Sequence, residues 1–123
     1  MKIKTSELIG PALDWAVAKA LGIRTYIGRY EHTLTGPCIL DADLVDMQTD
    51  GEQELKHSRS WAQGGPIIER ELISVSSQTN GHSWAAKGAH NYSYGPTPLI
   101  AAMRCFVASK LGDKVDVPEE LLP

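Results

Sequence analysis

The stretch YGPTPLIAAMRCFVASKLG, residues 94–112, decides the fold because it has the signals of a complete helix. Thr97 is a favoured N-cap residue, and Pro98 follows at the first helical position, where its missing N–H is not needed. Gly112 is a typical residue just past a helix end. Between these signals, apolar residues recur at helical spacing and predict a buried stripe: Leu99, Met103, Phe106 and Val107. We therefore expect a helix packed on a core, with Arg104 on its outer face.

The rest of the chain is divided by turn signals, above all by four Gly-Pro pairs. Apolar residues at helical spacing predict one more main helix, and β-branched and aromatic residues predict strands. An Asn80-Gly81 pair predicts a hairpin turn. The expected elements are a helix at 11–21, a strand within 23–34, a short helix at 65–71, hairpin strands at 72–77 and 83–89, and a loop at 90–94.

This order of elements predicts one α+β domain, residues 1–123. We expect a small antiparallel sheet covered by two main helices, in a sandwich-like arrangement. Residues 41–60 are acidic and polar without a clear period, and predict a long loop or excursion. Residues 113–123 predict an acidic tail that lies on the surface or on a partner.

Composition excludes several classes of protein. A formal net charge of -3 argues against bulk binding of DNA or RNA, which requires a basic face. No apolar run is long enough for a membrane span, and the N-terminus lacks the apolar core of a signal peptide. Cys38 and Cys105 match no metal or redox spacing and are expected to be free thiols.

No familiar catalytic or metal-binding signature is present, so we expect no catalytic residue, no metal and no cofactor. The segment from Asp46 resembles the start of a calcium loop, but His57 stands where the loop needs a bidentate glutamate. Cys105 belongs to the predicted C-terminal helix, where a thiol is expected to be inert packing. A hidden composite site, such as that of a phosphodiesterase or nuclease, stays an alternative.

The aromatic residues of the second half, including Tyr92, offer two interpretations. Trp61, Trp84 and Tyr94 can form a stacking platform for a flat ligand such as a nucleobase, or they can pack in the core. The free N–H groups after Thr97 can bind phosphate, as helix N-termini do. Arg70 or Arg104 would balance the ligand's charge, or each is an ordinary surface residue.

Three segments together resemble the NinX-like family of small proteins from tailed bacteriophages: MKIKTSELIGPALDWAVAKALG at 1–22, WAQGGPIIERE at 61–71 and GPTPLIAAMRCFVASKLGDKVDVPEEL at 95–121. Residues 23–60 do not take part in this resemblance. The W-x-A strand and the terminal helix are also similar to a broader group of phage α/β/α-sandwich domains. The resemblance implies a phage accessory protein that acts in the cytoplasm of the bacterial host.

Accessory phage proteins often counter host defences, and this context suggests a function. We expect a non-enzymatic homo-oligomer that sequesters a small anionic ligand, such as a cyclic nucleotide used as a host-defence signal. An alternative is a protein-interaction module that inhibits or redirects a host protein through its acidic excursion and tail. A phosphodiesterase or nuclease is the third hypothesis.

Overall fold

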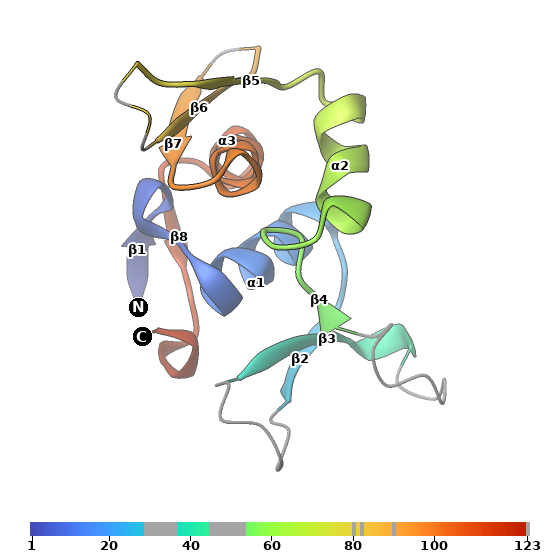
Figure 1. Cartoon of the computed structure of the whole chain (residues 1–123). Coiled ribbons are helices and arrows are strands. Elements are labelled where there is room, and N and C mark those ends of the chain that lie inside the picture. Colours follow the sequence, from blue (N-terminus) through green and yellow to red (C-terminus); the bar gives the residue numbers. More distant parts are fainter. Residues whose placement is uncertain (29–36, 45–53, 80, 82, 90, 123) are drawn as a thin grey trace.

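The computed structural model describes residues 1–28, 37–44, 54–79, 81, 83–89 and 91–122 (Figure 1). Within these ranges the helices are α1 (Gly10–Leu21), α2 (Trp61–Arg70), α3 (Pro98–Leu111) and the short 3-10 turns η1 (Thr5–Glu7), η2 (Ala42–Leu44) and η3 (Glu119–Leu121). The strands are β1 (Lys2–Lys4), β2 (Thr25–Gly28), β3 (Cys38–Asp41), β4 (Glu54–Leu55), β5 (Ser74–Ser77), β6 (Trp84–Lys87), β7 (Tyr92–Gly95) and β8 (Lys114–Asp116). The expected α+β class is confirmed.

The described strands form three small antiparallel sheets, where the sequence predicted one. β1 pairs with β8, so the two ends of the chain meet. β2, β3 and β4 form a second sheet, and β5, β6 and β7 form a third. The predicted hairpin is confirmed by the pairing of β5 with β6, although Asn80 itself lies outside the described residues.

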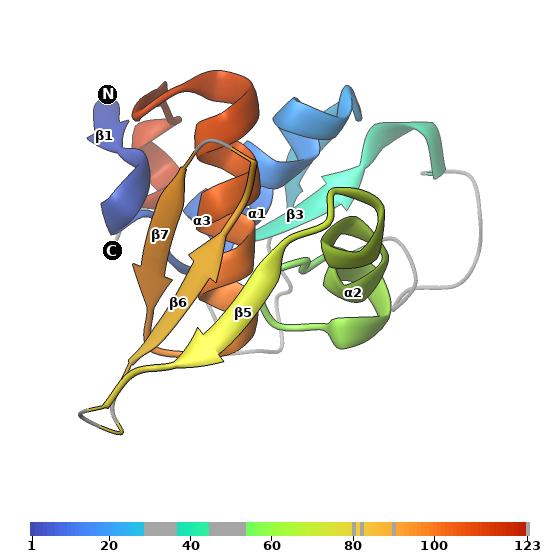
Figure 2. The ribbon, with the colours of Figure 1, turned by 90° about the horizontal axis from the view of Figure 1, so that it is seen from above.

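Helix α3 lies at the centre of the molecule. The β5–β7 sheet covers one side of it and α1 packs on another, while the β2–β4 sheet lies beyond α1 (Figure 1). Seen from above, β5, β6 and β7 cross the length of α3, and α2 lies beside it (Figure 2). Every residue from Leu99 to Val107 is buried, so the first turns of α3 have no solvent-facing side.

Local signals explain both ends of α3. The Thr97 side chain accepts a hydrogen bond from the Ile100 N–H, and Pro98 occupies the first helical position. Gly112 has a φ of 89°, a left-handed value that glycine adopts without strain. The predicted bounds of this helix are therefore confirmed, and the residues of the predicted stripe are buried, although burial extends around the whole helix.

Three local predictions are wrong. Helix α2 begins at Trp61, four residues before the predicted start, and contains Pro66. Residues 92–94, predicted as the end of a loop, belong to strand β7, which is held by its pairing with β6. Cys38–Asp41, for which the sequence predicted no element, is the central strand of the β2–β4 sheet.

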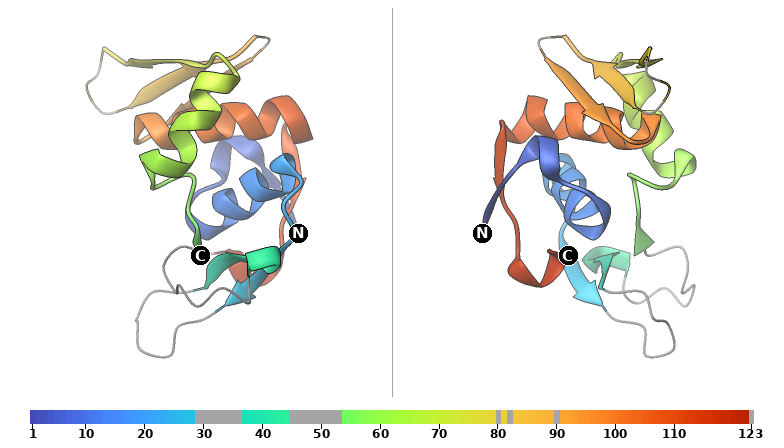
Figure 3. Two further views of the ribbon diagram at one scale, coloured as in Figure 1. Left: turned by 90° about the vertical axis from the view of Figure 1, so that its right-hand side faces the viewer. Right: turned by 60° about the vertical axis from the view of Figure 1, so that its left-hand side comes forward.

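The described parts of the two acidic segments contain regular structure that was not expected. In the 41–60 segment, residues 41–44 and 54–60 are described: η2 follows β3, β4 pairs with β3, and His57 and Ser58 are buried. Residues 45–53, including the calcium-like stretch, lie outside the described residues. The predicted surface tail instead runs beside β1 as β8 (Figure 3), and it buries Val115, Val117 and Leu121. The tail is thus part of the core.

Candidate functional site

Few backbone N–H groups at the N-terminus of α3 remain free to bind an anion. The Ile100 N–H donates to Thr97 Oγ1 over 3.1 Å, and the Ala101 N–H donates to the Thr97 carbonyl over 3.0 Å. Pro98 has no N–H. Only the Leu99 N–H remains in this first turn, and Leu99 is itself buried. The predicted phosphate site at Thr97 therefore has one donor where an effective site uses several.

Arg104 does not lie on an outer face, so that prediction is wrong. Its Nε donates to the Leu8 carbonyl and its Nη1 donates to the Tyr94 carbonyl, each over 2.8 Å. Burial lowers the pKa of the Arg104 guanidinium from its ordinary value. The side chain joins the N-terminal segment to β7, because α3 is covered on all sides at this point.

The three aromatic side chains predicted to stack do not share a surface. Trp84 packs against the core and lies opposite Gly95, so the next residue, Tyr94, points to the other face of the sheet. Trp61 is exposed in the first turn of α2, and Arg70 is exposed in its last turn. Because a helix rises 1.5 Å per residue, Trp61 and Arg70 are about 14 Å apart along its axis.

The solvent-facing side of the β5–β7 sheet is a better aromatic platform. Tyr92 and Tyr94 are 61% and 55% exposed, and they share this face because they are two residues apart on β7. Lys87 lies opposite Tyr92 on β6, with its ammonium 5.5 Å from the ring centroid. We call Lys87, Tyr92 and Tyr94 the tyrosine face.

A groove of about 270 Å³ opens where the tyrosine face meets the β1–β8 pair. Lys4 and Lys114 line it and are direct partners in the antiparallel pairing. Like charges in this position repel each other, so an anion between them would be stabilised. Neither ammonium makes an ion pair with another residue described here. We call this hollow the lysine groove; its lining residues are Lys4, Thr5, Ser6, Tyr92, Ser93, Ala108, Asp113 and Lys114.

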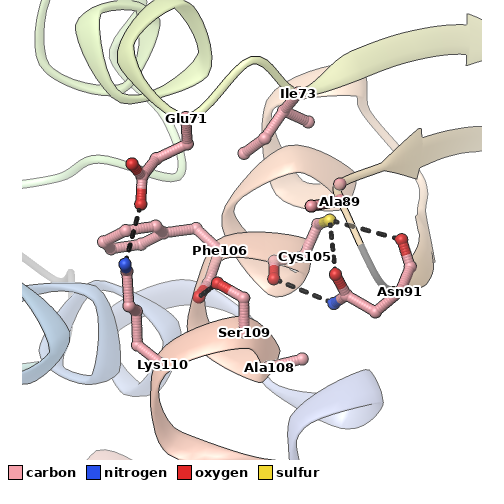
Figure 4. Close-up of a pocket in the computed structure, with 10 residues that line it drawn as sticks. Glu71, Ile73, Ala89, Asn91, Cys105, Phe106, Ala108, Ser109 and Lys110 are labelled. Atoms are coloured by element: carbon pink, nitrogen blue, oxygen red, sulfur yellow. Dashed lines mark hydrogen bonds and ion pairs between the residues drawn. The ribbon is translucent and has the colours of Figure 1, made fainter.

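A larger pocket of about 490 Å³ lies between the C-terminal half of α3, the turn after α2 and the turn before β7 (Figure 4). Ile73, Phe106 and Ala108 contribute apolar surface, and at one side Lys110 Nζ lies 3.1 Å from a Glu71 oxygen. This ion pair neutralises the lysine, so the pocket does not attract an anion. We call it the apolar pocket.

Cys105 also lines the apolar pocket but has no sign of reactivity. Its thiol lies 3.6 Å from Asn91 Oδ1, and the Asn91 amide donates to the Cys105 carbonyl over 3.1 Å (Figure 4). Burial raises the pKa of this thiol, which disfavours the nucleophilic thiolate. The predicted packing role of Cys105 agrees with this geometry.

A buried polar cluster that the sequence did not reveal joins α1 to the segment before α2. Asp14 Oδ1 accepts hydrogen bonds from the Ser58 N–H and hydroxyl over 2.8 and 2.7 Å. The neighbouring His57 is buried, its Nδ1 has no partner in the described structure, and burial lowers its pKa. Serine here contacts the carboxylate directly, unlike a catalytic triad, in which histidine stands between them.

Within the described ranges, no group of three or more His, Cys, Asp or Glu side chains is placed to hold a metal ion. The same part of the chain contains no helix that is both long and apolar enough to cross a membrane. The lysine groove with its adjoining tyrosine face is therefore the candidate site with the clearest ligand preference. Of the predicted site residues, it contains Tyr94 alone.

The comparison with protein families agrees with the resemblance seen in the sequence. A family model described as Bacteriophage P22, NinX matches residues 4–110. Curated proteins give no match. Because the family match covers most of the chain, including residues 23–60, the chain belongs to this bacteriophage NinX family.

Proposed function

We propose that this NinX-family protein is a non-catalytic binding protein that retains a small anionic, nucleotide-like ligand in the cytoplasm of the bacterial host. One observation carries the proposal: two lysines without an ion-pair partner among the described residues face each other in a groove whose wall includes an exposed tyrosine. Lysines supply the charge that a phosphate needs, and tyrosine faces stack on bases.

The spacing within the site suits one nucleotide. A phosphate between Lys4 and Lys114 would lie beside Tyr92, within reach of the Ser6 hydroxyl. Tyr94 lies two residues further along β7, about 7 Å away at the usual rise of a strand. A base attached to that phosphate would therefore reach the exposed ring of Tyr94.

The charge distribution favours a short ligand. The chain has a formal net charge of -3, so its long-range field repels a nucleic-acid strand. The lysine groove offers a local positive site, with Asp113 as the only carboxylate among its lining residues. With neither a reactive thiol nor a histidine in this lining, binding without conversion fits the groove better than catalysis.

Thermal shift against a panel of linear and cyclic nucleotides tests this function, with bound ligand recovered and identified by mass spectrometry. At a hundred times its dissociation constant, a ligand stabilises the folded state by about 2.7 kcal/mol. We expect a clear shift and an intact ligand. The Lys4→Gln/Lys114→Gln double variant should abolish the shift, and Tyr94→Ser should reduce it for nucleotides more than for inorganic phosphate.

Arg24→Gln is the matched control, because Arg24 is exposed and pairs with Asp43 beside the distant β2–β4 sheet. It removes a positive charge without touching the groove and should leave the shift unchanged. Recovery of a chemically altered ligand would indicate an enzyme. A panel without any shift would contradict the proposal and direct attention to a host protein as partner.

A further inference from the structure

Asp113 places a carboxylate in a groove that otherwise suits an anion. It lines the lysine groove together with Lys4 and Lys114, and its side chain is exposed. Within the described ranges, this carboxylate has no hydrogen-bond or ion-pair partner. A negative charge without a partner repels a phosphate bound between the two lysines. A ligand that suits the whole groove must therefore offer this carboxylate a hydrogen-bond donor.

The backbone at Asp113 is fixed by Thr5, which is buried. The Thr5 N–H donates to the Asp113 carbonyl over 2.9 Å, and Thr5 Oγ1 donates to the Gly112 carbonyl over 2.7 Å. These bonds join the start of the β8 segment to the end of β1, where the lysines pair. They use only backbone oxygens of Gly112 and Asp113, so the carboxylate stays available to a ligand. Its position beside the lysines is thus set before any ligand binds.

The position of Asp113 selects the part of a nucleotide that it can contact. Asp113 directly precedes Lys114, so their Cα atoms are about 3.8 Å apart. In a nucleotide the sugar is bonded directly to the phosphate, whereas the base would lie further away, at Tyr94. A metal ion on the phosphate is a poorer partner for this carboxylate, because the two lysines of the groove would repel the ion. A sugar hydroxyl is therefore the donor that best fits Asp113.

We propose that Asp113 accepts a hydrogen bond from the 2′-hydroxyl of a ribose, so that the lysine groove selects a ribonucleotide. This inference rests on the proposed function of the groove and names the class of its ligand. The 2′-hydroxyl is the sugar donor that linear and 3′,5′-cyclic ribonucleotides share, and it is the group that distinguishes ribose from deoxyribose. The same carboxylate disfavours free phosphate, so one side chain acts against two competing ligands.

Isothermal titration calorimetry tests the inference with inorganic phosphate and with ribonucleoside 5′-monophosphates and their 2′-deoxy counterparts. Wild type should bind the ribonucleotide about tenfold more tightly than the deoxyribonucleotide of the same base, because a hydrogen bond to a charged acceptor is lost. Asp113→Ala should bring this ratio close to one. The same variant should bind inorganic phosphate about two- to threefold more tightly, because the repulsion is removed.

Two further variants separate the hydrogen bond from the charge. Asp113→Asn keeps an acceptor oxygen without the charge, so it should bind phosphate as tightly as Asp113→Ala does and retain part of the preference for ribose. Glu69→Ala removes one exposed negative charge on α2, across α3 from the β1–β8 pair (Figure 1). It should change neither the affinity for phosphate nor the preference for ribose.

The outcomes distinguish this inference from the proposed function. If none of these ligands binds, or if the Lys4→Gln/Lys114→Gln double variant binds them as wild type does, both proposals are wrong. If binding requires the lysines but wild type binds ribonucleotides and deoxyribonucleotides equally, only the inference about Asp113 is wrong. A preference for ribose that survives Asp113→Ala would also overturn it.

Discussion

Asp14 lies on α1 with no exposed surface and holds the segment that follows β4. Its carboxylate accepts two hydrogen bonds from Ser58, and Arg59 Nη2 lies 3.5 Å from its second oxygen. Asp14 stands near the start of α1, where a carboxylate also interacts favourably with the helix dipole. Its partners lie more than forty residues away and cannot be found from local pattern.

Replacing Asp14 by alanine or by asparagine distinguishes the loss of a hydrogen-bond acceptor from the loss of a charge. Asp14→Ala leaves the Ser58 N–H and hydroxyl buried without an acceptor, so we expect a loss of about 2–4 kcal/mol in the free energy of unfolding. Asp14→Asn keeps an oxygen in place and should cost less. Urea denaturation of both variants at neutral pH measures these losses. An alanine variant as stable as the asparagine variant would contradict the role given to Ser58.

The contribution of Asp14 to the free energy of unfolding changes with pH in a defined direction. Burial raises the pKa of Asp14 above 3.8, and the hydrogen bonds from Ser58 only partly oppose this effect. Between 3.8 and the raised pKa, the folded state binds a proton that the unfolded state lacks, so stability falls as pH rises through this window. Wild type should therefore gain stability relative to Asp14→Asn as pH is lowered toward 4. Urea denaturation of both proteins across this pH range measures the gain. A stability difference between them that does not change with pH would contradict the prediction.

At the scale of elements, the contact between α2 and α3 depends on Gly64. A Cβ atom there would lie 2.6 Å from Leu99 Cδ1 and would also overlap the His57 carbonyl oxygen. The backbone oxygen cannot move aside without shifting the segment before α2. A Cβ atom on the adjacent Gly65 would meet no atom of another element within 4 Å, so that position is the control for contact with α3.

These two glycines lead to different expectations. Gly64→Ala should destabilise the protein by about 1–3 kcal/mol, the usual cost of overpacking a well-filled core. Gly65→Ala should change stability by less than about 1 kcal/mol, because the entropy that alanine saves in a helix is opposed by contact of its Cβ with the ring of Pro66. Thermal denaturation of the two variants side by side measures the difference. Equal effects would mean that α2 does not approach α3 as closely as the structure shows.

The sequence predicts elements well where the signals are local. Thr97, Pro98 and Gly112 mark α3, and the apolar period between them supplies the rest. Strand β7 was missed because its stretch YSYG, although tyrosine favours strands, is only four residues long and runs directly into a Gly-Pro turn signal. Its pairing with β6 and its packing on α3 decide its structure.

The candidate site also has one part that the sequence indicates and one part that it does not. Tyr92 and Tyr94 stand out in the sequence as aromatic residues near turns, and the structure places both on one open face. Lys4 and Lys114 come from opposite ends of the chain and meet only through the pairing of β1 with β8. No local sequence pattern predicts that pairing, so the two lysines of the site could not be identified from the sequence.

At the scale of the whole molecule, the N-terminal and C-terminal segments of the chain are bound to each other. The N-terminal ammonium lies 2.8 Å from Asp116 Oδ1, and the Val117 N–H donates to the Met1 carbonyl over 2.9 Å. The hydrogen bond and charge of the ammonium lower the pKa of Asp116. The expected acidic tail is therefore a structural strand that completes both the core and the lysine groove.

Removing residues 113–123 decides between a structural tail and a free interaction arm. The deletion exposes surface that Val115, Val117 and Leu121 cover and leaves β1 without a partner. At about 1.5–3 kcal/mol for each buried aliphatic side chain, the loss approaches the whole stability of a small domain. We expect circular dichroism to show a largely unfolded chain at 25 °C. The control, Glu119→Gln/Glu120→Gln, removes only exposed charge and should unfold at the wild-type temperature. A truncated chain with a native spectrum would instead support the free arm, because the core would then not need β8.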